Sequence, residues 1–153
     1  MIPAIGTRAP DFSLPSTSGT TSLSALVAER VVLLAFFPLA FTSTCTAEMC
    51  AFTDDYSQFE GRGVTVLGIS VDAVPTLKEY RARHAIAVDL ASDFRRDVSR
   101  AYGVLNDEKF YANRSYFLVD QTGTIRWSHV EAVNGHRREN AELLAAIESV
   151  VRA

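Results

Sequence analysis

Apolar residues gather in short continuous blocks at two places in the first half of the chain, and these blocks predict buried strands. Residues 31–37 and 64–71 are almost wholly apolar and rich in β-branched or aromatic side chains, which is typical of strands covered on both faces. Between them, apolar residues recur at spacings of four and three, which predicts a helix with one apolar stripe. Strand, helix and strand in this order predict a right-handed βαβ crossover. The stripe consists of Cys45, Met49, Phe52, Tyr56 and Phe59.

Two shorter helices are expected in the middle of the chain. Pro75 favours a helix start for residues 76–84, because proline is well tolerated in a first turn. A second helix is expected after Ser92 and Asp93, which are suited to cap it, and Gly103 is expected to end it. The apolar face of this second helix would consist of Phe94, Val98, Ala101 and Tyr102.

The last third of the chain has a different order of elements. Residues 115–119 and 124–130 have the pattern of strands and are joined by a turn-forming segment, which predicts an antiparallel hairpin. A final helix is expected from about Arg138. Two parallel strands followed by a hairpin and a helix predict an α/β fold in which helices flank a mixed sheet. The apolar face of the final helix is Leu143, Leu144, Ile147, Val150 and Val151.

Composition narrows the class of protein. The chain has 153 residues, 48% of them hydrophobic and 22% charged, so residues 1–153 are expected to form a single domain with a sizeable core. A net charge of -3 without long basic runs argues against nucleic acid or an anionic membrane as the main partner. The N-terminal residues contain no apolar signal segment, and the block at 31–37 is too short to span a bilayer, so we expect a cytoplasmic protein.

One of the two cysteines lies where a reactive thiol is expected. Cys45 follows Thr42, Ser43 and Thr44, which are hydroxyl residues suited to an N-cap. Whether Ser43 or Thr44 caps the helix, the thiol falls in the first turn, where the macrodipole favours a thiolate. A helix terminus stabilises an anion by only about 0.3–1 kcal/mol. A hydroxyl donor such as Thr42 and a fixed cation are therefore also expected, and Arg114 is the candidate cation. The alternative is that Cys45 is a small buried hydrophobe on the apolar stripe.

Pro38, Thr42 and Cys45 form the pattern P-x-x-x-T-x-x-C, which resembles the peroxidatic motif of the peroxiredoxins. The segment FFPLAFT is similar to the AhpE-type branch of this family, whereas the segment C-T-A-E-M-C is similar to the Q-type, or bacterioferritin comigratory, branch. The resemblance also covers GTRAPDFSLPSTSG, AYGV and NRSYFLVDQTGTIR. It implies a thioredoxin-like fold and a thiol peroxidase that reduces hydrogen peroxide and organic hydroperoxides without a metal, haem or flavin.

The resemblance also implies roles for individual residues. Arg114, at the start of a strand, would reach the peroxidatic sulfur. Thr42 would orient the peroxide, and the ring of Pro38 would shield the sulfur from solvent. Glu48 matches a family position too, but an acid in a first helical turn is expected on dipole grounds alone, so at most a supporting role is expected for it.

Cys50, five positions after Cys45, would be the resolving cysteine by resemblance to the Q-type branch. It would condense with a sulfenic acid on Cys45 to give an intramolecular disulfide that thioredoxin reduces. In an intact helix the two residues are ~7.5 Å apart along the axis, and an unstrained disulfide needs Cα atoms within ~7 Å. The helix start would therefore have to unwind.

Other readings of the cysteines stay open. An external thiol could resolve Cys45 instead of Cys50, or oxidation could serve a peroxide sensor or interaction module, or the chain could be a redox-inert thioredoxin-like binding domain. The spacing is not C-x-x-C, and no further soft ligands accompany the cysteines, so a zinc site is not expected. Resemblance to the AhpE-type branch favours a homodimer.

Overall fold

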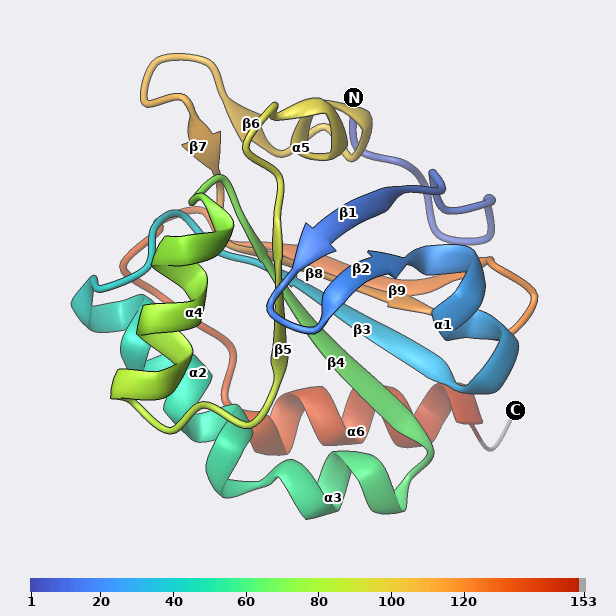
Figure 1. Ribbon diagram of the computed structural model, residues 1–153. Coiled ribbons are helices and arrows are strands. Elements are labelled where there is room, and N and C mark those ends of the chain that lie inside the picture. Colours follow the sequence, from blue (N-terminus) through green and yellow to red (C-terminus); the bar gives the residue numbers. More distant parts are fainter. Residues whose placement is uncertain (152–153) are drawn as a thin grey trace.

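A mixed sheet of seven strands lies at the centre of the protein, in a computed structural model that describes residues 1–151 (Figure 1). The strand order is β2-β1-β5-β4-β3-β8-β9, and β6 and β7 form a separate two-stranded sheet. The strands are β1 (Ser13–Ser16), β2 (Gly19–Ser22), β3 (Val31–Phe36), β4 (Val64–Ser70), β5 (Asp89–Ser92), β6 (Leu105–Asn106), β7 (Tyr111–Ala112), β8 (Ser115–Val119) and β9 (Ile125–Val130). The helices are α1 (Leu23–Glu29), α2 (Ser43–Asp54), α3 (Tyr56–Gly61), α4 (Val74–Arg83), α5 (Asp97–Ala101) and α6 (Asn140–Val151).

The centre of the sheet confirms the strands predicted from the apolar blocks. β3 pairs in parallel with β4 and antiparallel with β8. Its side chains alternate between two cores: Leu33 packs beneath α2, α3, α4 and α6, and Leu34 packs on the face that α1 and α5 cover. This burial on both faces explains why the strand shows no polar alternation. The predicted hairpin is also confirmed, because β8 pairs antiparallel with β9.

The long helix predicted after β3 is interrupted. Asp55 lies between α2 and α3 with φ -105° and ψ 18°, and Asn140 binds its carboxylate at 2.9 Å. Aspartate favours helix ends because its side chain competes for local hydrogen bonds. The prediction that Tyr56 lies on the buried stripe is therefore wrong: its side chain is 40% exposed, while Phe59 returns to the core.

The predicted helix after β5 also begins later than expected. Asp93 is buried, and its carboxylate accepts hydrogen bonds from the backbone N–H groups of Val98 and Ser99, in the first turn of a helix that begins at Asp97 with Arg96 as its N-cap residue. Phe94 therefore lies before the helix and is 60% exposed, contrary to the prediction. Gly103 ends the segment with φ +67°, a left-handed conformation that favours glycine, as predicted.

Smaller differences concern helix ends. α4 begins at Val74, two residues before the predicted start, and α6 begins at Asn140 rather than near Arg138. Such shifts are usual, because terminal turns lack part of their hydrogen bonding. Within residues 1–151, no helix is both long enough and apolar enough to cross a membrane.

Candidate active site

The Cys45 thiol lies at the junction between the central strand and α2. After β3, the backbone N–H of Phe37 still bonds Ile69 O at 2.9 Å, and the chain then crosses to α2. Cys45 is the third residue of α2 and is 1% exposed, which confirms its predicted place in the first turn. Of the three hydroxyl residues suited to an N-cap, Thr42 is the N-cap residue rather than Ser43 or Thr44, and its side chain makes no capping hydrogen bond.

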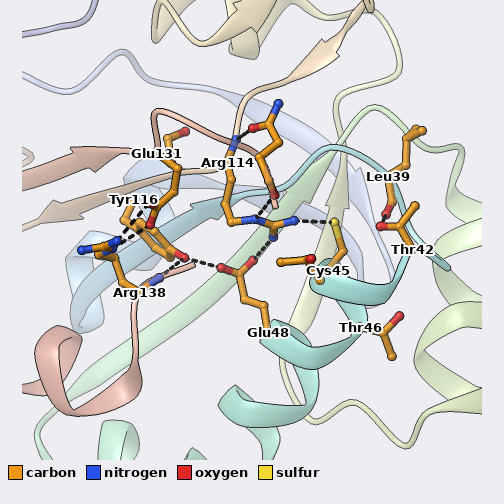
Figure 2. A network of polar contacts seen from close by, with 12 residues as sticks. Leu39, Thr42, Cys45, Thr46, Glu48, Arg114, Tyr116, Glu131 and Arg138 are labelled. Atoms are coloured by element: carbon orange, nitrogen blue, oxygen red, sulfur yellow. Dashed lines mark hydrogen bonds and ion pairs between the residues drawn. The ribbon is translucent and has the colours of Figure 1, made fainter. Parts of the chain in front are cut away.

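Arg114 points at this thiol from the residue before β8 (Figure 2). Its Nη2 lies 2.9 Å from Cys45 Sγ, and its Nη1 lies 2.8 Å from Glu48 Oε1. Its Nε donates to the carbonyl of Asn134 at 3.1 Å. The arginine is 1% exposed, and each of its three guanidinium nitrogens has a protein partner. The structure thus brings the predicted cation and the predicted thiol into contact.

Glu48 has a larger place in the site than its sequence position suggested. It lies in the second turn of α2, on the face shared with Cys45, and is 2% exposed. Burial raises the pKa of Glu48, while the charge of Arg114 and the hydrogen bond from Tyr116 act against that rise. Burial alone would lower the pKa of Arg114, but the neighbouring Glu48 first, and Cys45 next, raise it, so the guanidinium stays charged.

Tyr116 is a member of the site that the sequence did not reveal. Its buried hydroxyl donates to Glu48 Oε2 and accepts from the backbone N–H of Arg138 at 3.0 Å (Figure 2). Burial, reinforced by Glu48, raises the pKa of this phenol well above its ordinary value. The sequence did contain a signal for it, because residues two apart along a strand lie on the same face. Tyr116 could therefore have been predicted to lie on the same side of the sheet as Arg114.

A second ring of contacts fixes the position of Arg114. Its backbone N–H donates to Asn134 Oδ1 at 2.7 Å, and its carbonyl accepts from the N–H of Glu131 at 2.9 Å. Glu131 in turn receives two hydrogen bonds from Arg138, at 2.7 and 3.1 Å. The guanidinium therefore reaches the thiol from a backbone that is held on both sides.

Thr42 does not serve as the donor that was expected for the thiolate. Its exposed hydroxyl donates instead to the carbonyl of Leu39 at 2.7 Å (Figure 2). A hydroxyl has one hydrogen, so the remaining capacity of Thr42 Oγ1 is to accept. Pro38 is buried on the same connection between β3 and α2.

Cys50 lies on the same unbroken helix as Cys45, and both thiols are free. Cys45 is buried and Cys50 is half-buried. Five residues correspond to about 1.4 helical turns, so the two side chains point in different directions from α2. Between them, Thr46 accepts a hydrogen bond from the Tyr80 hydroxyl at 3.1 Å, which ties this turn to α4. Burial raises the pKa of Tyr80 to about 12, and both cysteines add to the rise.

Comparison with known proteins identifies the family. The model of the AhpC/TSA family matches residues 5–128. The chain belongs to the AhpC/TSA family of peroxiredoxins. This peroxiredoxin is 38% identical over 130 residues to alkyl hydroperoxide reductase E of Mycobacterium tuberculosis, covering 83% of this chain and 85% of that one. It is 36% identical over 144 residues to a putative peroxiredoxin bcp of Coxiella burnetii, covering 88% and 94%.

Solved structures agree with the sequence relatives. The reduced 2-Cys peroxiredoxin of Plasmodium vivax matches this peroxiredoxin with a TM-score of 0.91 at 28% identity, covering 98% of this chain and 83% of that one. AhpC of Mycobacterium tuberculosis matches with a TM-score of 0.86 at 25% identity, covering 98% and 99%. The thioredoxin-like fold and the mixture of AhpE-type and Q-type features predicted from the sequence are both confirmed.

Proposed function

We propose that this peroxiredoxin reduces hydroperoxides through the thiolate of Cys45. Sγ attacks the terminal oxygen of the hydroperoxide, the O–O bond breaks, and Cys45 becomes a sulfenic acid while the departing oxygen takes a proton and leaves as water or an alcohol. The observation that carries the proposal is the 2.9 Å contact between Arg114 Nη2 and Cys45 Sγ in a buried site. A fixed cation beside the sulfur favours its ionised form, which is the nucleophile.

Arg114 and Thr42 are proposed to make complementary hydrogen bonds to the substrate, with Arg114 as the donor and Thr42 as the acceptor. Arg114 carries more than one N–H in a planar fork, so it can donate to the sulfur and to a peroxide oxygen together. Thr42 has already used its hydrogen on Leu39, so its oxygen accepts the O–H of the hydroperoxide. This pairing would align the O–O bond for attack and stabilise the leaving oxygen. Pro38 would limit the access of water.

The second half of the proposed cycle uses Cys50. The Cys50 thiol displaces hydroxide from the sulfenic acid, which leaves as water with the thiol proton, and an intramolecular disulfide forms. An external dithiol, proposed to be thioredoxin, then reduces the disulfide and is itself oxidised. Because both residues lie on intact α2, its first turns must open before the bond can form. The competing cycle, in which an external thiol attacks the sulfenic acid directly, requires no such opening.

Peroxide consumption by two serine variants tests the proposal. Cys45→Ser should abolish peroxidase activity, because no other group in the site supplies a nucleophilic sulfur. Cys50→Ser is the matched control, and it should keep the first oxidation of Cys45 while losing thioredoxin-dependent turnover. Substantial turnover by the folded Cys45→Ser protein would refute the assignment of Cys45, whereas full thioredoxin-dependent turnover by Cys50→Ser would refute only the assignment of Cys50.

A further inference from the structure

The peptide group between Leu39 and Ala40 is held at both of its polar ends. Its carbonyl, on Leu39, accepts the hydroxyl of Thr42 at 2.7 Å. Its N–H, on Ala40, donates to Asp72 Oδ2 at 2.8 Å. Because a peptide group is planar and rigid, the two bonds together fix the rotation of one unit. The direction of the Thr42 hydroxyl therefore depends on a contact made on the other side of that peptide.

Asp72 is itself well supported. It follows β4, whose last residues pair with the last residues of β3, so it lies at the same edge of the sheet as the connection to α2. Its carboxylate accepts the buried hydroxyl of Ser70 at 2.7 Å, and its backbone carbonyl accepts the hydroxyl of Ser92 at 2.6 Å. A carboxylate held in this way presents Oδ2 to the backbone N–H of Ala40 in a fixed direction.

The segment that Asp72 holds is not in a relaxed conformation. Phe41, directly after Ala40, has φ +65°, a left-handed value that is uncommon for a residue other than glycine. Its half-exposed ring packs on the Tyr80 ring with centroids 4.9 Å apart. Without the bond to Asp72, the chain on the Leu39 side of this residue would be free to rotate towards an ordinary conformation.

We propose that Asp72 is a positioning residue for the peroxidase reaction. Asp72 acts through the Leu39–Ala40 peptide and thereby keeps Thr42 Oγ1 an acceptor for the hydroperoxide. The inference rests on the proposed roles of Cys45 and Thr42. If the peptide rotates, the Leu39 carbonyl leaves Thr42, and the threonine hydroxyl becomes free to donate elsewhere. The acceptor then no longer has a fixed direction towards the substrate.

Two reactions of Cys45 separate this role from a general structural one. Reaction with hydrogen peroxide needs the Thr42 acceptor, whereas alkylation by iodoacetamide needs only an accessible thiolate. Both rates would be measured for the reduced parent protein and for the single variants Asp72→Ala, Asp72→Asn and Thr42→Val. The two double variants, in which Thr42→Val is combined with Asp72→Ala or with Asp72→Asn, would be measured in the same way. Glu29→Ala, which removes an exposed acid at the end of α1, is the control for loss of one negative charge.

Asp72→Ala is expected to slow the peroxide reaction by about 10- to 100-fold, the usual result of a misplaced positioning group. Its alkylation rate should match the parent's, and Asp72→Asn should retain most of the peroxide rate because an amide oxygen can still accept from Ala40. In the Thr42→Val background, Asp72→Ala should cause no further loss, because its effect passes through Thr42. Should Asp72→Ala fail to fold, Asp72→Asn takes its place in the same cycle, with a smaller loss that also disappears beside Thr42→Val.

Other outcomes would overturn the inference. Equal slowing of the peroxide reaction and of alkylation would mean that Asp72 only supports the fold around Cys45. Losses that multiply in the double variant would mean that it acts independently of Thr42. A parent protein whose Cys45 is not oxidised by peroxide would instead overturn the proposed function, and this inference with it, so the two failures are distinguishable.

Discussion

Tyr116→Phe is the substitution that most directly tests the buried polar network behind Cys45. The variant removes one oxygen and keeps the ring, so it creates no large cavity. It leaves Glu48 Oε2 and the backbone N–H of Arg138 without the hydrogen bond that the phenol makes to each. A buried group deprived of its hydrogen bond costs about 1–3 kcal/mol, and here two groups lose a hydrogen bond at once. We therefore expect Tyr116→Phe to reduce the free energy of unfolding by about 2–4 kcal/mol.

Two other tyrosines provide matched controls. Tyr102 is equally buried, but its hydroxyl makes a single bond, to the neutral carbonyl of Pro10 at 2.7 Å. Tyr102→Phe should therefore reduce the free energy of unfolding by about 1 kcal/mol. Tyr56 is 40% exposed, and Tyr56→Phe should change it by less than about 0.5 kcal/mol. All three variants make the same chemical change, so their order isolates the effect of the partners.

The assay is denaturant unfolding of the reduced proteins, supported by thermal melts. For a chain of this size, 1 kcal/mol corresponds to about 2–4 °C in Tm, so Tyr116→Phe should melt about 4–16 °C below the parent. The denaturant slopes should stay equal, because the same surface is exposed on unfolding. If Tyr116→Phe unfolds at the same midpoint as Tyr102→Phe or Tyr56→Phe, the phenol does not link Glu48 to Arg138 as described.

Two further predictions concern the role of Arg114 in the peroxide reaction and the stability of the protein at alkaline pH. Arg114→Lys keeps a charge but replaces the planar fork with one ammonium, so the peroxide reaction measured by stopped flow should slow on the order of 100-fold. Arg126→Lys on the surface is the control. Equal rates for the two variants would contradict the role given to Arg114. The pKa of Tyr80 is raised to about 12 in the folded protein from 10.0, so Tyr80 contributes stability that is present below pH 10 and lost as the pH rises through 12. Tyr80→Phe should therefore lose less stability than the parent across this alkaline window in denaturant titrations, and equal losses would disprove the assignment.

The elements that could be predicted from the sequence are those whose residue pattern is compatible with only one type of secondary structure. Buried parallel strands leave continuous apolar blocks, so β3 and β4 were predicted nearly to their ends. Helical spacing was less decisive, because Tyr56 and Phe59 keep the spacing of α2 across a break that only Asp55 marks. The placement of Phe94 was wrong for a similar reason: Asp93 binds first-turn N–H groups of α5 from outside the helix, and periodicity does not record such local hydrogen bonds.

The chemistry of the site was predictable only in part. Cys45 could be placed by local position, and Arg114 by its likeness to a family motif, but the contact between Arg114 and Glu48 joins residues 66 positions apart and depends on how β8 lies beside β3. The direction of the Thr42 hydroxyl could not be predicted. It depends on a peptide in an irregular segment that ends at Phe41 in a left-handed conformation, which no spacing rule describes.

The intact mass and the free-thiol count of the reduced protein after one equivalent of hydrogen peroxide test the central claim most directly, with Cys50→Ser measured alongside. The proposed cycle predicts that the parent loses both thiols and two hydrogens to an intramolecular disulfide, while Cys50→Ser gains one oxygen on Cys45. An added oxygen on Cys45 in both proteins would contradict the role of Cys50 and favour resolution by an external thiol. A parent protein that keeps both thiols would contradict the assignment of Cys45 as the peroxidatic residue.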